Sequence, residues 1–424
     1  MQHTVKRILF LFLLLTNTWY HPINGLPTCA FDTIKPYDTY LWTAPRKTNE
    51  LQVEVYGASS FHERGVWCDH TKICNVLQLY SCDQNALAML RGFDPNSEIG
   101  QFAAQFSQVP DDGVRGHLVP YAQFHLSEVG LSAQYWFPHY ICLGVYLPIL
   151  QMSLTDICWR DLTQNITAAD ALTKQLLTDN FAYNVCKLGG PVINQPYKCT
   201  GIGDINVVAR LQRNFPQAKS VLTNTQLGGY LGFSLPTGKR TNEDLLFALP
   251  FGYDGSPGVL FGGTLELTWK NHFIGGVQVN LTQLIGNTRQ RRIRTDTTQT
   301  DLVLLAKTPA HLSWGFIQRY RLYLGAYQII RGLSFDIGYQ HQKQGHSIVS
   351  LCGNEYIGSV ANTSQILKEW TLHDIMVNLH YNFGYDASMD SKFSPTITFF
   401  YQHAFRGRRA LLLDKWGFAV EVNF

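Results

Sequence analysis

The sequence predicts an all-β chain folded as a single antiparallel transmembrane β-barrel of about twelve strands, with short helices in long loops. Three observations support this prediction: many segments alternate between apolar and polar residues, the chain ends in such a segment, and long and short connections follow one another in turn. Alternation with a period of two gives a strand one apolar and one polar face. The pattern allows ten to fourteen strands.

The composition agrees with a membrane barrel. Of the 424 residues, 15% are charged and 13% are aromatic, and 35 are glycine. Ordinary soluble domains contain about 25% charged residues. A secreted all-β protein would share these features, so composition alone does not choose between the two. The net charge of +3 is too small to indicate a nucleic-acid partner.

The N-terminus predicts export. Lys6 and Arg7 precede the apolar run 8–15, and polar residues and Gly25 follow. This order is typical of a secretory signal, so we expect a signal peptide at 1–25 and a barrel over 26–424. Eight apolar residues are too few to span a bilayer as a helix, and no later stretch reaches the roughly 20 that are needed. An exported chain that enters a membrane must then form a closed barrel.

The first half of the chain predicts three strands and two long insertions. Strands are expected at 51–56, 117–137 and 140–150, where apolar and polar residues alternate or run in extended blocks. The insertions lie at 58–115, with a helix-like piece at 85–91, and at 155–200, with a helix at 167–185. Nine cysteines are present, and Cys186 and Cys199 are candidates to staple the second insertion. The cysteine spacings do not match a zinc site.

The second half predicts a regular series of strands. They are expected at 204–212, 227–235, 264–269, 277–282, 314–328, 333–340, 375–384, 396–402 and 416–424. Short turns fall near 138, 214–224, 271, 331 and 386–393. Long loops fall at 237–260, 286–312 and 344–370, with a shorter one at 405–414. Membrane barrels have short periplasmic turns and long outer loops, so both termini are expected on the periplasmic side.

Two features resemble a known class of proteins. In the last strand Phe418, Val420, Val422 and Phe424 share one face, which resembles the terminal strand of Gram-negative outer-membrane β-barrels. The segments Gly201-Ile202-Gly203-Asp204-Ile205 and Leu235-Pro236-Thr237-Gly238 resemble pieces of outer-membrane channel proteins, including some linked to uptake of hydrophobic compounds. The resemblance implies an outer-membrane channel or transporter for small solutes. It also implies that the strand ending at Phe424 contacts the outer-membrane assembly machinery.

The polar faces of the strands supply candidates for the barrel interior, because in such barrels the apolar face meets lipid and the polar face lines the lumen. One hypothesis is an open solute path. The alternative is a plugged lumen whose polar groups pair and support the wall, which would make the protein a structural or surface-interaction barrel. The lumen-lining candidates are Asp204, Arg210, Glu266, Gln278, Asn280, Asp336, Gln340, Asn378, His380 and Asn382.

Arginines are concentrated in two of the expected outer loops. Arginine binds phosphate through a planar fork of donors, so lipopolysaccharide or an anionic solute is the candidate partner. A plain solvated loop is the alternative. The candidates are Arg289, Arg291, Arg292 and Arg294 in one loop, and Arg406, Arg408 and Arg409 in the other.

The sequence gives little support to an enzyme. His380, Ser334 and Asp336 are the residues one would nominate in an outer-membrane hydrolase, but no spacing ties a nucleophile to a base. The Gly201-x-Gly203 pair lacks the third glycine of a dinucleotide site. We therefore expect no catalytic activity, no cofactor and no metal. Trp269, Trp314, Trp370 and Trp416 lie at expected strand ends, where an interfacial aromatic girdle would place them.

Overall fold

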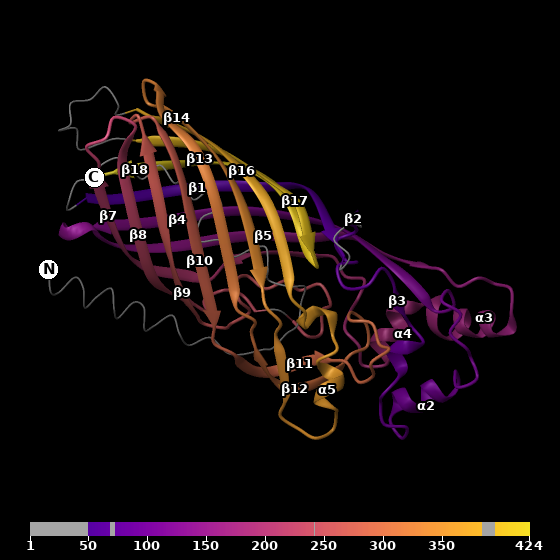
Figure 1. Ribbon diagram of the computed structural model, residues 1–424. Helices are drawn as coiled ribbons and strands as arrows, with labels where there is room; N and C mark the ends of the chain where they lie inside the picture. The colour runs from indigo at the N-terminus through magenta and orange to yellow at the C-terminus, as the bar shows by residue number, and fades with distance from the viewer. Residues whose placement is uncertain (1–49, 68–72, 241, 384–394) are drawn as a thin grey trace.

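The computed structural model describes residues 50–67, 73–240, 242–383 and 395–424, so the expected signal peptide and the turn near 386–393 lie outside the described residues. Twelve long strands form one closed antiparallel barrel, in which each strand pairs with the barrel strands before and after it (Figure 1). They are β1 (Glu50–Val66), β4 (His117–Trp136), β5 (Ile141–Asp161), β7 (Ile205–Pro216), β8 (Leu222–Leu235), β9 (Gly258–Trp269), β10 (Phe273–Leu284), β13 (Ile317–Ile330), β14 (Leu333–Gln344), β16 (Trp370–Asn382), β17 (Thr396–Arg408) and β18 (Ala410–Asn423).

The barrel closes at β1, which pairs with β18 on one side and β4 on the other. The short connections between β4 and β5, β7 and β8, β9 and β10, and β13 and β14 share one end of the barrel with the C-terminus. The long connections carry all the helices α2 to α5 and lie at the opposite end, which we call the outer end (Figure 1). The predicted fold class and the strand count of twelve are confirmed.

The strands separate polar from apolar side chains as the alternation predicts. On β16, Ile375, Leu379 and Tyr381 are exposed, whereas the intervening Asn378 and His380 are buried. The exposed set across the barrel is largely aliphatic and aromatic, and the buried set contains most of the polar strand residues. An apolar outer surface and a polar inner one are what a barrel in lipid requires.

Smaller elements cover the outer end. No helix in the described part of the chain has the length and apolar character needed to cross a membrane. A separate sheet of β11, β12 and β15 forms a cap beside α5. The bounds are β2 (Ile73–Cys74), β3 (Gln84–Asn85), η2 (Ala88–Leu90), α2 (Glu98–Ala104), α3 (Ala168–Thr173), η4 (Lys174–Thr178), α4 (Phe181–Lys187), β6 (Tyr197–Ile202), β11 (Asn287–Ile293), β12 (Ala306–Ser313), β15 (Ile348–Leu351), α5 (Gly358–Ala361) and η5 (Gln365–Leu367), with η3 (Pro138–Tyr140) at the other end.

The helix expected at 167–185 is present as α3, η4 and α4 in succession. It begins with a capping box: the Thr167 hydroxyl accepts from the Asp170 backbone N–H, and the Asp170 carboxylate accepts from the Thr167 backbone N–H. The expected Cys186–Cys199 disulfide is wrong, since both cysteines are unpaired.

Several expected boundaries are corrected by strands that continue past the barrel. β1 runs to Val66, and β5 runs to Asp161, so strand occupies the first residues of the regions expected as insertions from 58 and from 155. The loop expected at 405–414 is instead a tight hairpin in which only Arg409 separates β17 from β18. The extended end of β1 pairs with the start of β18, where Arg64, Gly65 and Val66 lie opposite Leu412, Leu411 and Ala410. The backbone N–H and C=O groups of each segment are therefore hydrogen-bonded by the other.

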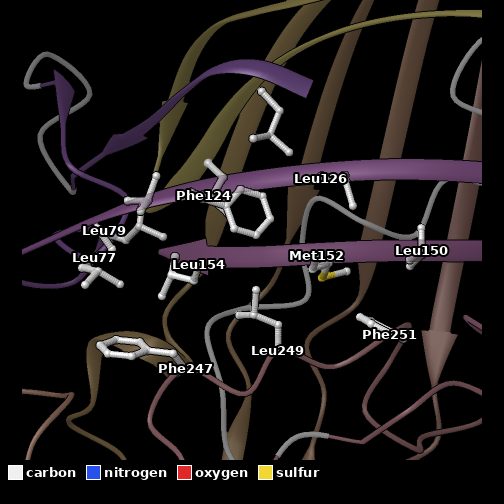
Figure 2. Packing of buried hydrophobic residues seen from close by; sticks show 14 of the residues in the cluster. Leu77, Leu79, Phe124, Leu126, Leu150, Met152, Leu154, Phe247, Leu249 and Phe251 are labelled. Atoms are coloured by element: carbon white, nitrogen blue, oxygen red, sulfur yellow. The ribbon is translucent and has the colours of Figure 1, made fainter. Parts of the chain in front are cut away.

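The connection between β8 and β9, residues 236–257, folds inward instead of extending into solvent. Phe247, Leu249 and Phe251 pack against the inner faces of β4 and β5, as Figure 2 shows. Their partners are Phe124, Leu126, Leu150, Met152 and Leu154, with Leu77 and Leu79 of the first long connection. Apolar residues at inward positions of β4 and β5 therefore bind a loop, which narrows the outer end of the barrel.

Replacing Leu379 with arginine tests the facing of β16. Leu379 is 43% exposed on the apolar outer surface, so we expect Leu379→Arg to lower the free energy of unfolding in phospholipid vesicles by roughly 2–4 kcal/mol if it lies near the midplane. Ile166→Arg is the matched control, because Ile166 is 77% exposed beyond the strands at the outer end. Equal losses in the two variants, measured by denaturant titration, would contradict this facing.

Candidate functional site

The structure places nine of the ten lumen-lining candidates on barrel strands with their side chains directed inward. Glu266, Gln278, Asp336, Gln340, Asn378 and His380 are buried, and Arg210, Asn280 and Asn382 are half-buried. The tenth, Asp204, precedes β7 and makes contacts with a loop, described below. Inward polar groups are thus packed against other protein atoms, and most have named partners.

One polar network joins β14, β16 and β17. His380 lies 2.8 Å from the Asp336 carboxylate through Nε2 and 2.8 Å from the Thr398 hydroxyl through Nδ1, and Asn378 Nδ2 donates to Asp336 at 2.8 Å. The order of acid, imidazole and hydroxyl resembles a catalytic relay. Thr398 is only 5% exposed and Asp336 is fully buried, so no substrate reaches this hydroxyl in the structure. The network fastens three strands together.

Further networks contain residues that the sequence analysis did not single out. Arg321 donates to Gln340 at 2.9 Å, and Gln340 donates to Asp374 at 3.1 Å. Tyr323 donates to Glu266 at 2.8 Å, and its ring crosses Gly276, where a Cβ would meet the Tyr323 hydroxyl. Asp374 could have been found from the sequence. It lies one residue before the strand expected at 375–384, and its side chain continues the inward-facing series of that strand.

The four arginines expected in a loop at 286–312 lie in and just after a strand, so the loop prediction is wrong. Residues 287–293 form β11, which pairs with β12 over its whole length. Arg289 pairs with Asp254, Arg294 with Asp301 at 2.6 Å, and Arg292 donates to the Glu243 carbonyl at 2.6 Å. These three arginine side chains, which we expected to bind phosphate, therefore bind carboxylates and a backbone carbonyl of this chain.

The second arginine group is also largely engaged. Arg408 pairs with Glu369 at 3.0 Å, and Arg409 donates to the Glu369 carbonyl at 2.9 Å and to Gln365 at 3.2 Å. Arg406 is exposed near the tip of the β17–β18 hairpin. These contacts tie the hairpin to the segment before β16.

Asp204 holds the inward loop in place. Its carboxylate accepts from the Gly238 backbone N–H at 2.9 Å and from the Tyr253 backbone N–H at 2.6 Å, which lie near the two ends of residues 236–257. Thr237 adds a bond from its hydroxyl to the Gly203 carbonyl at 2.9 Å. Burial raises the pKa of Asp204 to about 7, and the two backbone donors oppose that shift. The two segments quoted for their resemblance to channel proteins are therefore in direct contact.

The inside of the barrel contains cavities at successive heights. An inner cavity of about 260 Å³ is lined by Asn214, Asn224 and Thr268 near the short turns. A middle cavity of about 10 Å³, room for about one water, is lined by Tyr230 and Asn280 farther along the same wall. The polar groups of Glu266, Gln278 and Tyr323 occupy the strand positions between these two cavities.

The outer cavity has a volume of about 130 Å³ and lies at the outer end. Its wall is mostly apolar and includes Trp314 and Trp370, so these two tryptophans are not at the lipid interface as expected. Its polar lining includes Glu243, Arg291 and Arg294. Burial raises the pKa of Glu243 to about 8 and lowers that of Arg291 to about 10.

A small apolar cluster separates the outer cavity from the middle one. Tyr253 packs with Leu284 and Ile317, and Trp314 lies against them. Tyr253 and Ile317 line the middle cavity, whereas Asp254 and Trp314 line the outer one. We call Tyr253, Leu284 and Ile317 the outer constriction. Asp204 positions it by binding the backbone N–H of Tyr253.

In the described ranges, no group of three or more His, Cys, Asp or Glu side chains is arranged to hold a metal ion. No protein-family model and no curated protein matches the chain in sequence.

Comparison with solved structures identifies the type of fold. An outer-membrane channel from Pseudomonas putida F1 is similar with a TM-score of 0.50 and 12% sequence identity, over 91% of this chain and 99% of that one. The toluene transporter TodX from Pseudomonas putida aligns with 89% of this chain and 89% of its own, with 11% identity and a TM-score of 0.31. The first similarity shows a shared barrel fold. It agrees with the resemblance to outer-membrane barrels noted in the terminal strand.

The buried arginine pairs make the cap sensitive to substitution. Asp301 is 1% exposed, so we expect Arg294→Gln to destabilise the β11–β12 sheet by roughly 3–5 kcal/mol, because a buried carboxylate loses its partner. Lys307→Gln is the control, since Lys307 pairs with the exposed Asp244 and should cost at most about 1 kcal/mol. Amide hydrogen exchange in β11 and β12 measures both, and equal protection in the two variants would refute the pairing argument.

Proposed function

We propose that this protein is an outer-membrane channel for small solutes and that the structure represents its closed form. The observation that carries the proposal is the series of cavities in the interior of one closed barrel and beneath its cap, with the outer constriction between the outer and middle ones. The shared fold with an outer-membrane channel supports it. The N-terminal pattern and the terminal strand ending at Phe424 support export to the outer membrane of a Gram-negative-type bacterium and insertion by its assembly machinery.

The side chains between the cavities are of a kind that can move aside. Tyr323 donates a side-chain hydrogen bond to Glu266, and Tyr230 donates one to Asn280 at the middle cavity. A rotamer change exchanges such a bond for one to water at little net cost, because the net value of a hydrogen bond is only about 1 kcal/mol. Opening the passage therefore needs side-chain movement and leaves the strand ladder intact.

The alternative is a structural barrel permanently closed by its loops. The apolar packing of Phe247, Leu249 and Phe251 against β4 and β5 favours a fixed loop. This packing lies on one side of the barrel, whereas the middle and inner cavities lie along β7 to β10 and β13. A loop fixed on that wall is compatible with a passage along the other, which Tyr253 of the same loop narrows.

Ion conductance in planar lipid bilayers tests the proposal. We expect wild-type protein to give discrete current steps, and the double variant Tyr253→Ala and Tyr323→Ala to give larger or more frequent ones, because both aromatic obstructions are removed. Tyr183→Ala, on the exposed face of α4, is the matched control and should behave as wild type.

The same experiment identifies failure of the proposal. Folding is checked for each sample by its faster migration when unheated on a denaturing gel. Absence of current in correctly folded wild type and in the double variant would leave the structural barrel as the function.

A further inference from the structure

The outer cavity has the size and lining of a ligand site. Besides Trp314 and Trp370, its walls include Leu302, Leu312 and Val349. An apolar cavity of about 150 Å³ stays dry and accepts a molecule of the size of benzene. At about 130 Å³, the outer cavity suits one aromatic ring or a short aliphatic chain.

Four acidic or basic side chains on this cavity have a buried polar atom without a hydrogen-bond partner among the described residues. Glu243 is 1% exposed, and neither of its carboxyl oxygens has a hydrogen-bond partner among the described residues. The Nε–H groups of Arg291 and Arg294 and the Oδ1 atom of Asp301 are also buried and unbonded there. A ligand that pairs with these groups would supply the hydrogen bonds that the described residues do not give them.

The charges around the cavity favour an anion. Four cationic side chains line it, Arg291, Arg292, Arg294 and Lys368, against the three carboxyl groups of Glu243, Asp254 and Asp301. Asp254 is already paired with Arg289, and Asp301 with Arg294. Positive charge is therefore in excess whichever protonation state Glu243 adopts.

Glu243 itself acts as a donor near neutral pH. Burial raises its pKa to about 8, so the neutral acid predominates at pH 7. The charged groups that act on it are Arg289, Arg291 and Arg292, which favour its ionisation, and Asp254, which opposes it. A protonated Glu243 offers one hydroxyl donor beside its carbonyl acceptor, and the two arginine Nε–H groups offer two more donors. A carboxylate complements these three donors.

We propose that the outer cavity binds a small monocarboxylate with an apolar body, such as one aromatic ring, its carboxylate received by Arg291, Arg294 and Glu243. The inference that such a monocarboxylate is also the transported solute rests on the proposed channel function. Binding itself is measured on purified protein without transport, so a silent channel that binds and a conducting channel that does not bind are separate results.

Calorimetric titration of the full-length protein in detergent tests the site with three probes of equal size: benzoate, benzyl alcohol and benzylamine. At pH 7 we expect benzoate to bind at least tenfold more tightly than benzyl alcohol, and benzylamine not to bind. Quenching of tryptophan fluorescence should accompany binding, since Trp314 and Trp370 line the cavity. Equal affinities for the three probes, or a preference for benzylamine, would overturn the proposal without any variant.

Two substitutions assign the polar groups. Arg291→Met should weaken benzoate at least tenfold and leave benzyl alcohol unchanged, whereas Lys307→Met, on the exposed part of β12 outside the cavity, should change neither. Wild-type affinity for benzoate should fall as pH rises from 7 to 9, because Glu243 becomes an anion beside the ligand. Glu243→Gln keeps a donor and stays neutral, so it should remove this fall. Unchanged benzoate binding in Arg291→Met, or the same pH dependence in Glu243→Gln, would refute the assignment.

Discussion

Closure of the backbone hydrogen-bond ladder at β1 is the constraint on which the rest of the structure depends. A sheet with an open edge cannot sit in lipid, because the unpaired N–H and C=O groups have no water to bind. β1 satisfies both edges at once, pairing with β18 from Gln52 to Val66 and with β4 from Glu50 to Ser59. Once the ring closes at twelve strands, alternate side chains must fill a fixed interior. The polar networks inside the barrel are the result.

The same closure forces the long connections to one end, where they compete for the space above the lumen. The connection over residues 236–257 occupies the interior because its apolar residues pack against apolar, inward-facing residues of β4 and β5. A single carboxylate, Asp204, then fixes both ends of that connection and with them the outer constriction. A strand end, a loop and a narrowing of the barrel interior are thus coupled through one side chain.

Local patterns predicted the barrel well and its outer end poorly, for a physical reason. The facing of β16 follows from alternation, since Leu379 and Asn378 occupy opposite faces whatever their distant neighbours are. Arg289 and Arg294 are different: their partners, Asp254 and Asp301, come from a loop and from a turn after β11, and no local signal reveals such pairs. Trp314 and Trp370 were likewise placed correctly near strand ends but on the wrong side. Strand position fixes the height of a side chain, and only the register fixes its face.

In the proposed channel, the distribution of hydrogen-bond partners favours one place for recognition of a solute. Asp336, Gln340 and Glu266 each accept a hydrogen bond from a neighbouring side chain of the wall, although Oε1 of Glu266 is buried without a partner among the described residues. Glu243 and the Nε–H groups of Arg291 and Arg294 have no such bonds, although they are equally buried. Unsatisfied buried groups gain more from a ligand than satisfied ones, because a ligand that pairs with them breaks no existing bond. On the proposed function, recognition therefore belongs to the cavity under the cap, and the barrel interior below it serves as the passage.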